Sequence, residues 1–287
     1  MKILLAKVKH PGNSVEFIKY AIDMAQSFNF NLHLLHVQYQ SPETHHTHVG
    51  DSNSPLLTKD LTDKMMVQNT LDELQKNTKQ ILTEKNVDIA VDYSAEMGPD
   101  SMVLNSFIEE KNIEMILLDD DDNSILSLSS SHMKIVKLAK CPVWIIPSNL
   151  PFKHFQKIVY ATDYQEADVH NLKKLISLFS GFSPQIIALH ITDSLEFEER
   201  VLRKGFKDTL EKETDFEKLS IRLLKDKNDH PEDSIDEFAK EINADLIVLL
   251  KENRGFFERI FKPSSTQRML NKTNLPVLIF QEDINDD

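Results

Sequence analysis

Short apolar runs alternate with amphipathic segments along the whole of this 287-residue chain. The runs are rich in Ile, Leu and Val and almost continuous, which is typical of parallel strands covered on both faces. Between the first two runs, Ile18, Ala21, Ile22 and Ala25 line one face of an amphipathic helix predicted over 14–28. Similar patterns predict helices over 58–85, 100–111, 127–139, 166–180, 195–214, 231–243 and 263–273. The chain therefore reads as an α/β protein.

The apolar runs occur twice in the same order. The matched pairs are KILLA 2–6 with KIVYA 157–161, LHLLHV 32–37 with IIALHI 186–191, IEMILLD 113–119 with ADLIVLL 244–250, and CPVWIIP 141–147 with LPVLIF 275–280. Such order predicts a tandem duplication. Pro147 and Pro151 disfavour regular structure at the junction. We predict one domain over 1–148 and a second over 152–282.

Each half is expected to form a five-stranded, mostly parallel sheet with helices on both faces. Segment 87–93 alternates apolar and polar residues, which favours a strand with one more solvated face. The last strands, 142–147 and 276–280, are expected to pair the two halves as an intramolecular pseudo-dimer, which would cover sheet edges. Ligands of such sheets bind beyond the carboxyl ends of the strands.

KILLA, LHLLHV and CPVWIIP in the first copy, with KIVYATD, IALHI and LPVLIF in the second, resemble the universal stress protein family over essentially the whole chain. The resemblance implies two tandem flavodoxin-like or Rossmann-like domains, cytoplasmic residence and a role in stress response or signalling. Together with the need to cover sheet edges, it is also the ground for expecting the last strands to pair as an intramolecular pseudo-dimer. Many members of the family bind ATP and others do not. The ATP-binding members carry an Asp after the first strand and a Gly-x-x-Gly segment that ends in Gly-Ser/Thr before the last helix.

In the second copy, the resemblance assigns Asp163, Gly255 and Ser264 to this motif, but Pro263 replaces its last glycine. Proline removes one backbone donor, although it suits the first turn of a helix. The hydroxyls of Ser264, Ser265 and Thr266 can still hold an anion at the helix N-terminus. We therefore expect at most one weak ATP site, in the second domain, at Asp163, Gly255, Ser264, Ser265 and Thr266.

In the first copy, the sequence match places Val8 where the Asp should be, and its loop after residue 118 has no glycine. Asp119–Asp122 follow the fourth strand directly and would repel a triphosphate. A divalent cation would reverse that sign, but a solvated acidic loop also accounts for the run. We expect no nucleotide site in this copy.

His45, His46 and His48 lie in a polar loop in which nothing fixes the orientation of ligands, so no metal site is predicted. His36 and His190 end matching strands, and packing or edge hydrogen bonding explains them better than catalysis. Cys141 is the one cysteine, which suits a reducing cytoplasm and predicts a buried, inert thiol. No catalytic residue is predicted.

The net charge of −13 disfavours nucleic acid and anionic membranes as partners. Three hypotheses remain. The first is a non-enzymatic binding module with ATP as the one possible cofactor, and the second is an interaction protein with vestigial pockets and unknown protein partners. The third, a slow ATPase, lacks a matched nucleophile and base or a phosphate loop with lysine.

Overall fold

The computed structural model describes residues 2–38, 55–120, 130–192, 197–226, 230–251 and 273–281, with the backbone alone at 55–60 and 130–131. The chain divides into two compact units. Unit 1 comprises 1–119 with 149–152, and unit 2 comprises 120–148 with 153–287. Each unit is built on strands whose apolar side chains are buried on both sides of the sheet.

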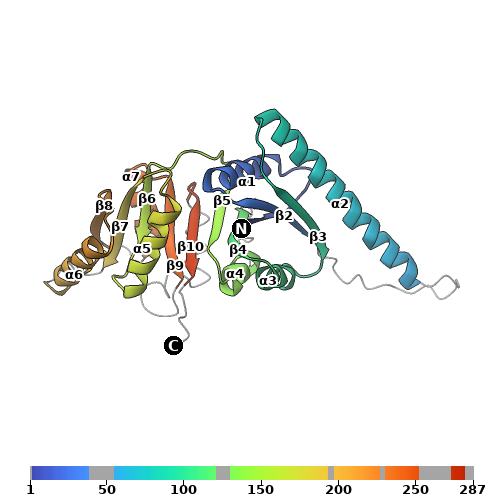
Figure 1. The fold of residues 1–287 in the computed structure, drawn as a ribbon. Coiled ribbons are helices and arrows are strands. Elements are labelled where there is room, and N and C mark those ends of the chain that lie inside the picture. Colours follow the sequence, from blue (N-terminus) through green and yellow to red (C-terminus); the bar gives the residue numbers. More distant parts are fainter. Residues whose placement is uncertain are drawn as a thin grey trace. The chain divides into compact units, whose positions relative to one another are not determined.

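The sheet of unit 1 has the strand order β3-β2-β1-β4. Its strands are β1 (Ile3–Val8), β2 (Asn31–Gln38), β3 (Val91–Met97) and β4 (Ile113–Asp120). Its helices are α1 (Val15–Phe28), α2 (Pro55–Lys85) and α3 (Asp100–Glu110). All strand pairs in this unit are parallel among the pairings described, so right-handed crossovers place α1 and α2 on one face and α3 on the other (Figure 1).

The sheet of unit 2 has the strand order β5-β10-β9-β6-β7-β8. Its strands are β5 (Val143–Pro147), β6 (Lys157–Ala161), β7 (Gln185–Thr192), β8 (Leu219–Lys225), β9 (Leu246–Lys251) and β10 (Val277–Gln281). Its helices are α4 (Ser130–Leu138), α5 (Glu166–Leu178), α6 (Phe197–Glu213) and α7 (Pro231–Glu241). As in unit 1, the first two crossover helices of the second repeat, α5 and α6, lie on the same face.

Strand β5 closes the first repeat in sequence, yet it belongs to unit 2. It pairs antiparallel with β10, with Trp144 opposite Leu278. Trp144 is fully buried, and its ring contacts Phe155 and Phe179 at centroid distances of 5.4 and 6.0 Å. The pairing expected between strands 142–147 and 276–280 is therefore confirmed, and an aromatic cluster stabilises it.

The predicted fold class is confirmed, since strands β1–β5 and β6–β10 give each repeat five strands in a mostly parallel arrangement. The predicted strand over 87–93 is wrong in its bounds, because β3 begins at Val91 and pairs with β2 up to Met97. The alternating pattern continues past residue 93, so periodicity alone did not fix the ends of this strand. The helix predicted over 263–273 lies almost wholly outside the described residues.

The domain boundaries at 148 and 152 stay a prediction. In the described ranges, no helix combines the length and the apolar character that a membrane span requires.

Candidate functional site

The turn from β6 into α5 carries Asp163, the first predicted ligand-binding residue. Asp168, which is fully buried, holds this turn together. Its two carboxylate oxygens accept hydrogen bonds from the hydroxyls of Tyr160 (2.9 Å) and Thr162 (2.8 Å) and from the backbone N–H groups of Asp163 (3.0 Å) and Gln165 (3.1 Å). One carboxylate therefore fixes both the end of the strand and the start of the helix.

Burial raises the pKa of Asp168, because the charged form loses its hydration, while the four hydrogen bonds oppose that shift. Four donors aimed at two oxygens suit a carboxylate rather than a neutral acid. The turn is thus preorganised before any ligand arrives. Asp163 itself remains 20% exposed in its side chain, so it is open to a ligand while its backbone is fixed.

His190, near the end of β7, lies beside this turn. Its Nδ1–H donates to the carbonyl oxygen of Thr162 at 2.8 Å, and Nδ1 lies 3.8 Å from the carboxylate of Asp163. Nε2 lies 3.3 Å from Oε2 of Glu199, which comes from the first turn of α6. The edge hydrogen bonding expected of His190 is confirmed, and the surroundings of its ring are acidic.

Tyr164 covers His190 from the other side. Its ring stacks on the imidazole at 4.4 Å and contacts Phe206 of α6 at 5.0 Å. Its φ of 60° lies in the left-handed region, which is uncommon for a residue with a bulky side chain. Burial raises the pKa of the Tyr164 hydroxyl, so this group stays neutral.

The register of the strands identifies the matching turn in the first repeat. Leu4 pairs with Leu32 of β2, and Ile158 pairs with Ile186 of β7, so Leu4 corresponds to Ile158. Counting five residues onward in each strand, Lys9 corresponds to Asp163. The sequence match that placed Val8 there is wrong by one residue. Aligning KILLA with KIVYA sets Ile3 against Ile158, whereas the strand register sets Leu4 against Ile158.

His36 of β2 repeats the bond of His190. Its Nδ1–H donates to the carbonyl oxygen of Val8 at 2.9 Å, so edge hydrogen bonding is confirmed here as well. Its surroundings differ, since Lys7 lies close and is ion-paired with Asp100 at 2.8 Å. Burial lowers the pKa of His36, and the positive charges of Lys7 and His10 lower it further.

The remaining predicted ligand residues of the second repeat, Gly255, Ser264, Ser265 and Thr266, lie outside the described residues. The last residue described before them in the sequence is Lys251, at the end of β9. There, Lys251 donates from Nζ to the carbonyl oxygen of Lys137 at 2.8 Å, and burial lowers the pKa of Lys251. Of the predicted ligand residues, the structure therefore describes Asp163 alone.

The other residues singled out in the sequence are the acidic run, the histidine loop and the cysteine. Asp119 is buried at the end of β4, and Asp121 and Asp122 lie outside the described residues, as do His45, His46 and His48. Within the described ranges, no group of three or more His, Cys, Asp or Glu side chains is placed to hold a metal ion. Cys141 is free and buried.

Sequence reasoning missed Asp168, Tyr164 and the contact between His190 and Glu199. A signal for Asp168 was available, because an acidic residue three positions after Gln165 at a helix start is typical of an N-terminal cap. Nothing in the sequence marks Tyr164 or Glu199, because their roles depend on how α6 packs against the turn.

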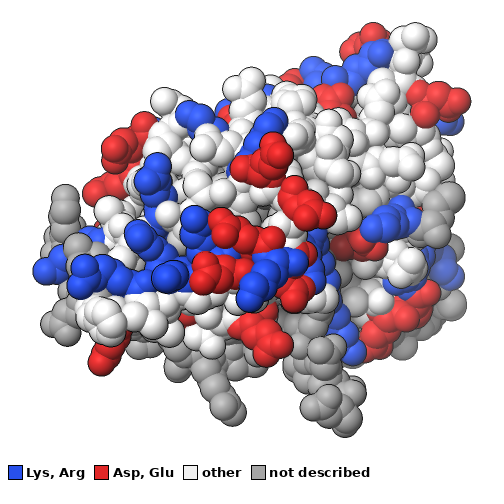
Figure 2. All heavy atoms as spheres, turned by 60° about the vertical axis from the view of Figure 1, so that its left-hand side comes forward, with Lys and Arg blue, Asp and Glu red and all other residues white. Residues whose placement is uncertain are grey.

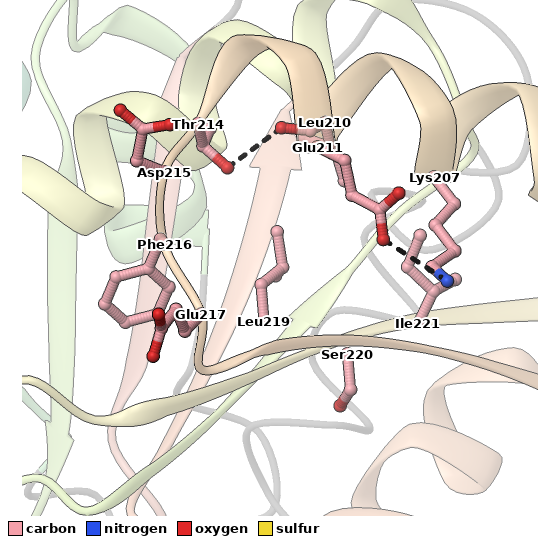
Figure 3. Close-up of a pocket in the computed structure, with 10 residues that line it drawn as sticks. All are labelled: Lys207, Leu210, Glu211, Thr214, Asp215, Phe216, Glu217, Leu219, Ser220 and Ile221. Carbon is pink, nitrogen blue, oxygen red and sulfur yellow. Dashed lines mark hydrogen bonds and ion pairs between the residues drawn. The ribbon is translucent and has the colours of Figure 1, made fainter.

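A cavity of about 430 Å³ lies elsewhere, between α6 and β8. Figure 3 shows two interactions among its lining residues, since the Thr214 hydroxyl donates to the carbonyl of Leu210 and Lys207 pairs with Glu211 at 3.3 Å. Figure 2 shows basic and acidic side chains side by side over much of the face that it displays. Neither feature marks a binding site for a nucleotide or a nucleic acid.

The universal stress protein family matches the chain twice, over residues 1–147 and 154–281. A universal stress protein of Methanocaldococcus jannaschii is 24% identical over 141 residues, which cover 45% of this chain and 83% of that protein.

Two solved structures share the fold over nearly the whole chain. A universal stress protein from Archaeoglobus fulgidus matches with a TM-score of 0.65 at 13% identity. The match covers 99% of this chain and 97% of the Archaeoglobus chain. A protein of unknown function from Pseudomonas aeruginosa matches with a TM-score of 0.60 at 14% identity. The match covers 98% of this chain and 92% of the Pseudomonas chain. With both repeats matched, the chain belongs to the universal stress protein family and carries the family's domain in tandem.

Proposed function

We propose that the protein is a non-enzymatic binding module of the stress response, acting in the cytoplasm, with at most one weak adenine-nucleotide site in the second repeat. The observation that carries this proposal is the position of Asp163. Its carboxylate lies at the carboxyl edge of the parallel sheet, where ligands of this fold class bind, and Asp168 fixes its backbone. A carboxylate there can accept a hydrogen bond from the exocyclic amine of adenine.

The described residues fit the base end of such a ligand. Asp163 is partly exposed, and the turn that carries it is held by buried hydrogen bonds, so binding costs little ordering of this turn. The phosphates would fall to Ser264, Ser265 and Thr266, whose placement stays a prediction. The first repeat, with Lys9 in place of Asp163, offers no acceptor at that position.

The alternative is an interaction protein whose pockets no longer bind a nucleotide. The first repeat favours it, because Lys9 stands in place of the acceptor and Asp119 is buried at the end of β4. A slow ATPase is a weaker third candidate, and the same binding experiment distinguishes it when phosphate release is followed in parallel.

Isothermal titration of the full chain with Mg-ATP tests the proposal. We expect saturable binding near one ATP per chain, weakened about tenfold or more in Asp163→Asn, since a hydrogen bond to a charged group contributes about 1.5–3 kcal/mol. The control is Asp215→Asn, an exposed carboxylate away from the turn, which should bind as the wild type does.

Absence of heat at millimolar ATP, or equal affinity in Asp163→Asn, would leave the interaction protein as the better account. Phosphate release above background that Asp163→Asn abolishes would instead make the protein an enzyme.

We also propose that the two repeats act as an intramolecular pseudo-dimer through their last strands. The antiparallel pairing of β5 with β10 supports this proposal, because it joins the final strand of each repeat within one chain. It leaves neither of these strands as an exposed edge on that side.

A further inference from the structure

The order of the described strands ends at β3 in unit 1 and at β8 in unit 2, so each unit presents one edge strand. Each of these strands has seven residues. The outward backbone N–H and C=O groups of an edge strand can pair with a further strand, and charged side chains on the edge control which strand that is. The charges of the two edges therefore indicate what pairs with them.

The exposed charges of β3 are acidic and lie on one face of the strand. Asp92 and Glu96 are both exposed, and the alternation of a strand places them on the same side. Tyr93 lies on the opposite side, where its hydroxyl is hydrogen-bonded to Thr78 of α2. Within the described ranges, neither acid takes part in an ion pair. The acidic side of β3 is thus the side away from α2.

The exposed charges of β8 are basic and have the same spacing. Lys218, just before the strand, and Arg222 are exposed and four residues apart, as the two acids of β3 are. Figure 3 shows Leu219 and Ile221 on the side of β8 that faces α6, so alternation puts both basic residues on the side away from this helix. The Lys218 ammonium donates to two oxygens of Ser183, at 2.9 and 3.2 Å, which leaves one of its three protons for a further acceptor.

An antiparallel pairing of β3 with β8 of a second copy matches these side chains. In one register, the opposed residues have opposite charges on one face and are mainly apolar on the other. The pairs are Asp92 with Arg222, Glu96 with Lys218, Ser94 with Ser220, Tyr93 with Ile221 and Ala95 with Leu219. Opposite charges and apolar side chains directly across two strands both stabilise the pairing.

The backbone hydrogen bonds made within each unit are compatible with this register. The Ala90 carbonyl accepts from β2 at 3.0 Å, and the Lys218 carbonyl accepts from β7 at 2.9 Å. Even-numbered residues of both strands therefore turn their backbone groups inward, and odd-numbered residues turn them outward. An antiparallel neighbour must set outward residues opposite one another, as Tyr93 and Ile221 are. A parallel neighbour would set outward residues opposite inward ones, so it could not bring both acids opposite both basic residues.

The same charges oppose pairing between like edges. Two copies of β3 centred on Ser94 would place Asp92 opposite Glu96. Two copies of β8 centred on Ser220 would place Lys218 opposite Arg222 in the same way. Like charges directly opposite one another destabilise a strand pair, so the unlike edges are the favoured partners.

We propose that β3 of one copy pairs antiparallel with β8 of another, so that the protein assembles head to tail. Such an interface joins two different surfaces, and the assembly therefore extends or closes into a ring. The hollow of about 430 Å³ between α6 and β8 lies beside this edge and leaves room for side chains of the incoming strand (Figure 3). The interface does not involve the proposed nucleotide site, so Asp163→Asn should assemble as the wild type does.

Sedimentation velocity of the full chain over a range of concentrations tests the proposal. We expect self-association at low salt that weakens as salt screens the charge pairs. Two double variants each make both edges alike, and each should associate at least tenfold more weakly. They are Asp92→Lys/Glu96→Lys and Lys218→Glu/Arg222→Glu.

Mixed in equal amounts, these two variants should associate again, because each edge of one variant then has the opposite charge to an edge of the other. The control is Glu109→Lys/Glu110→Lys on α3, which changes the net charge as much as the variant of β3 does. It should associate as the wild type does.

Cross-linking tests the register. Ser94→Cys mixed with Ser220→Cys should form a disulfide between copies under mild oxidation, since the two residues come opposite one another in a pair without hydrogen bonds. Neither variant alone should do so, and Cys141 is buried.

Circular dichroism should show all variants folded, and the salt dependence and the cross-link serve alone if a charge variant does not fold. A monomeric wild type would overturn the proposal and leave the two edges to strands of other proteins. Undiminished association in either charge variant, or a mixture that stays apart, would overturn it as well.

Discussion

His36 and His190 occupy matching positions in the two repeats and make the same bond. Each donates from Nδ1 to the carbonyl at the end of the neighbouring strand, Val8 in one repeat and Thr162 in the other. Their surroundings are opposite in charge. Lys7 lies close to His36, whereas carboxylates lie within 4 Å of His190.

The comparison separates what the two repeats share at the carboxyl edge of the sheet, the bond from histidine to carbonyl, from what differs there, the charged residues. The bond from histidine to carbonyl ties two parallel strands together beyond their regular ladder, and both repeats keep it. The charged residues around it point to no common role, since Lys9 takes the position of Asp163. One edge therefore offers hydrogen-bond donors to a ligand, and the other offers acceptors.

The largest effect is expected where the second repeat fixes its turn. Asp168→Ala leaves the hydroxyls of Tyr160 and Thr162 and two backbone N–H groups without their acceptor. We expect a loss of about 3 kcal/mol or more in the free energy of unfolding of unit 2. Urea unfolding followed by the fluorescence of Trp144, the one tryptophan, reports on this unit.

The first repeat supplies the matched control for this experiment. Its turn is fixed by Ser14, whose hydroxyl accepts from the His10 N–H at 3.3 Å. Ser14 lies in unit 1, so both variants are also followed by far-UV circular dichroism, and Ser14→Ala should cost only about 1 kcal/mol. Equal losses for Asp168→Ala and Ser14→Ala would show that the buried carboxylate does not hold the turn as inferred.

A second difference between the repeats predicts acid sensitivity. His33 is buried in unit 1, where its Nε2–H donates to Ser94 and Nδ1 accepts from Lys111, while the register places Ile187 at the equivalent position of β7. Burial lowers the pKa of His33 to about 4. The unfolded chain, with a pKa near 6.5, binds the proton more readily, so stability is full above about pH 6.5 and is lost as the pH falls towards 4.

The loss should be on the order of 2–3 kcal/mol in unit 1. His33→Ile, which copies the second repeat, should remove it. The measurement is the change in unfolding free energy between pH 7 and pH 4.5, followed by far-UV circular dichroism, in wild type and variant. Ile18→Val serves as a buried control without a titrating group. An unchanged pH dependence in His33→Ile would contradict the assignment.

The fold could be predicted from the sequence because both repeats carry the same apolar runs, and burial on both faces makes those runs nearly continuous. The pairing of the last strands could be predicted from the family resemblance together with the need to cover sheet edges. The bounds of β3 could not be predicted, because alternation from Val87 to Met97 is compatible with more than one register.

The candidate site was predictable only at Asp163, which lies beside a recognisable strand. Lys9 was missed because the likeness of two apolar strands says nothing about a shift of one residue.

The smallest expected effect tests the charge difference around the two histidines directly. The pKa of His36 should lie below its ordinary value, and Lys7→Met should raise it, because one positive charge beside the ring is removed. Asp100→Asn should lower it, because the carboxylate of Asp100 favours the charged imidazole. Each change should be a fraction of a pKa unit, equivalent to less than about 1 kcal/mol.

The two changes should largely cancel in Lys7→Met/Asp100→Asn, since the ion pair is then removed as a whole. Titration of the imidazole C–H signals of His36 by NMR gives its pKa in the wild type and the three variants. Lys2→Met, which removes a positive charge just before β1 and away from the ring, is the control and should leave the pKa of His36 unchanged. Shifts of the same sign in both single variants would mean that the ring responds to a movement of β1 rather than to charge. The charge difference between the two edges would then not account for the behaviour of their histidines.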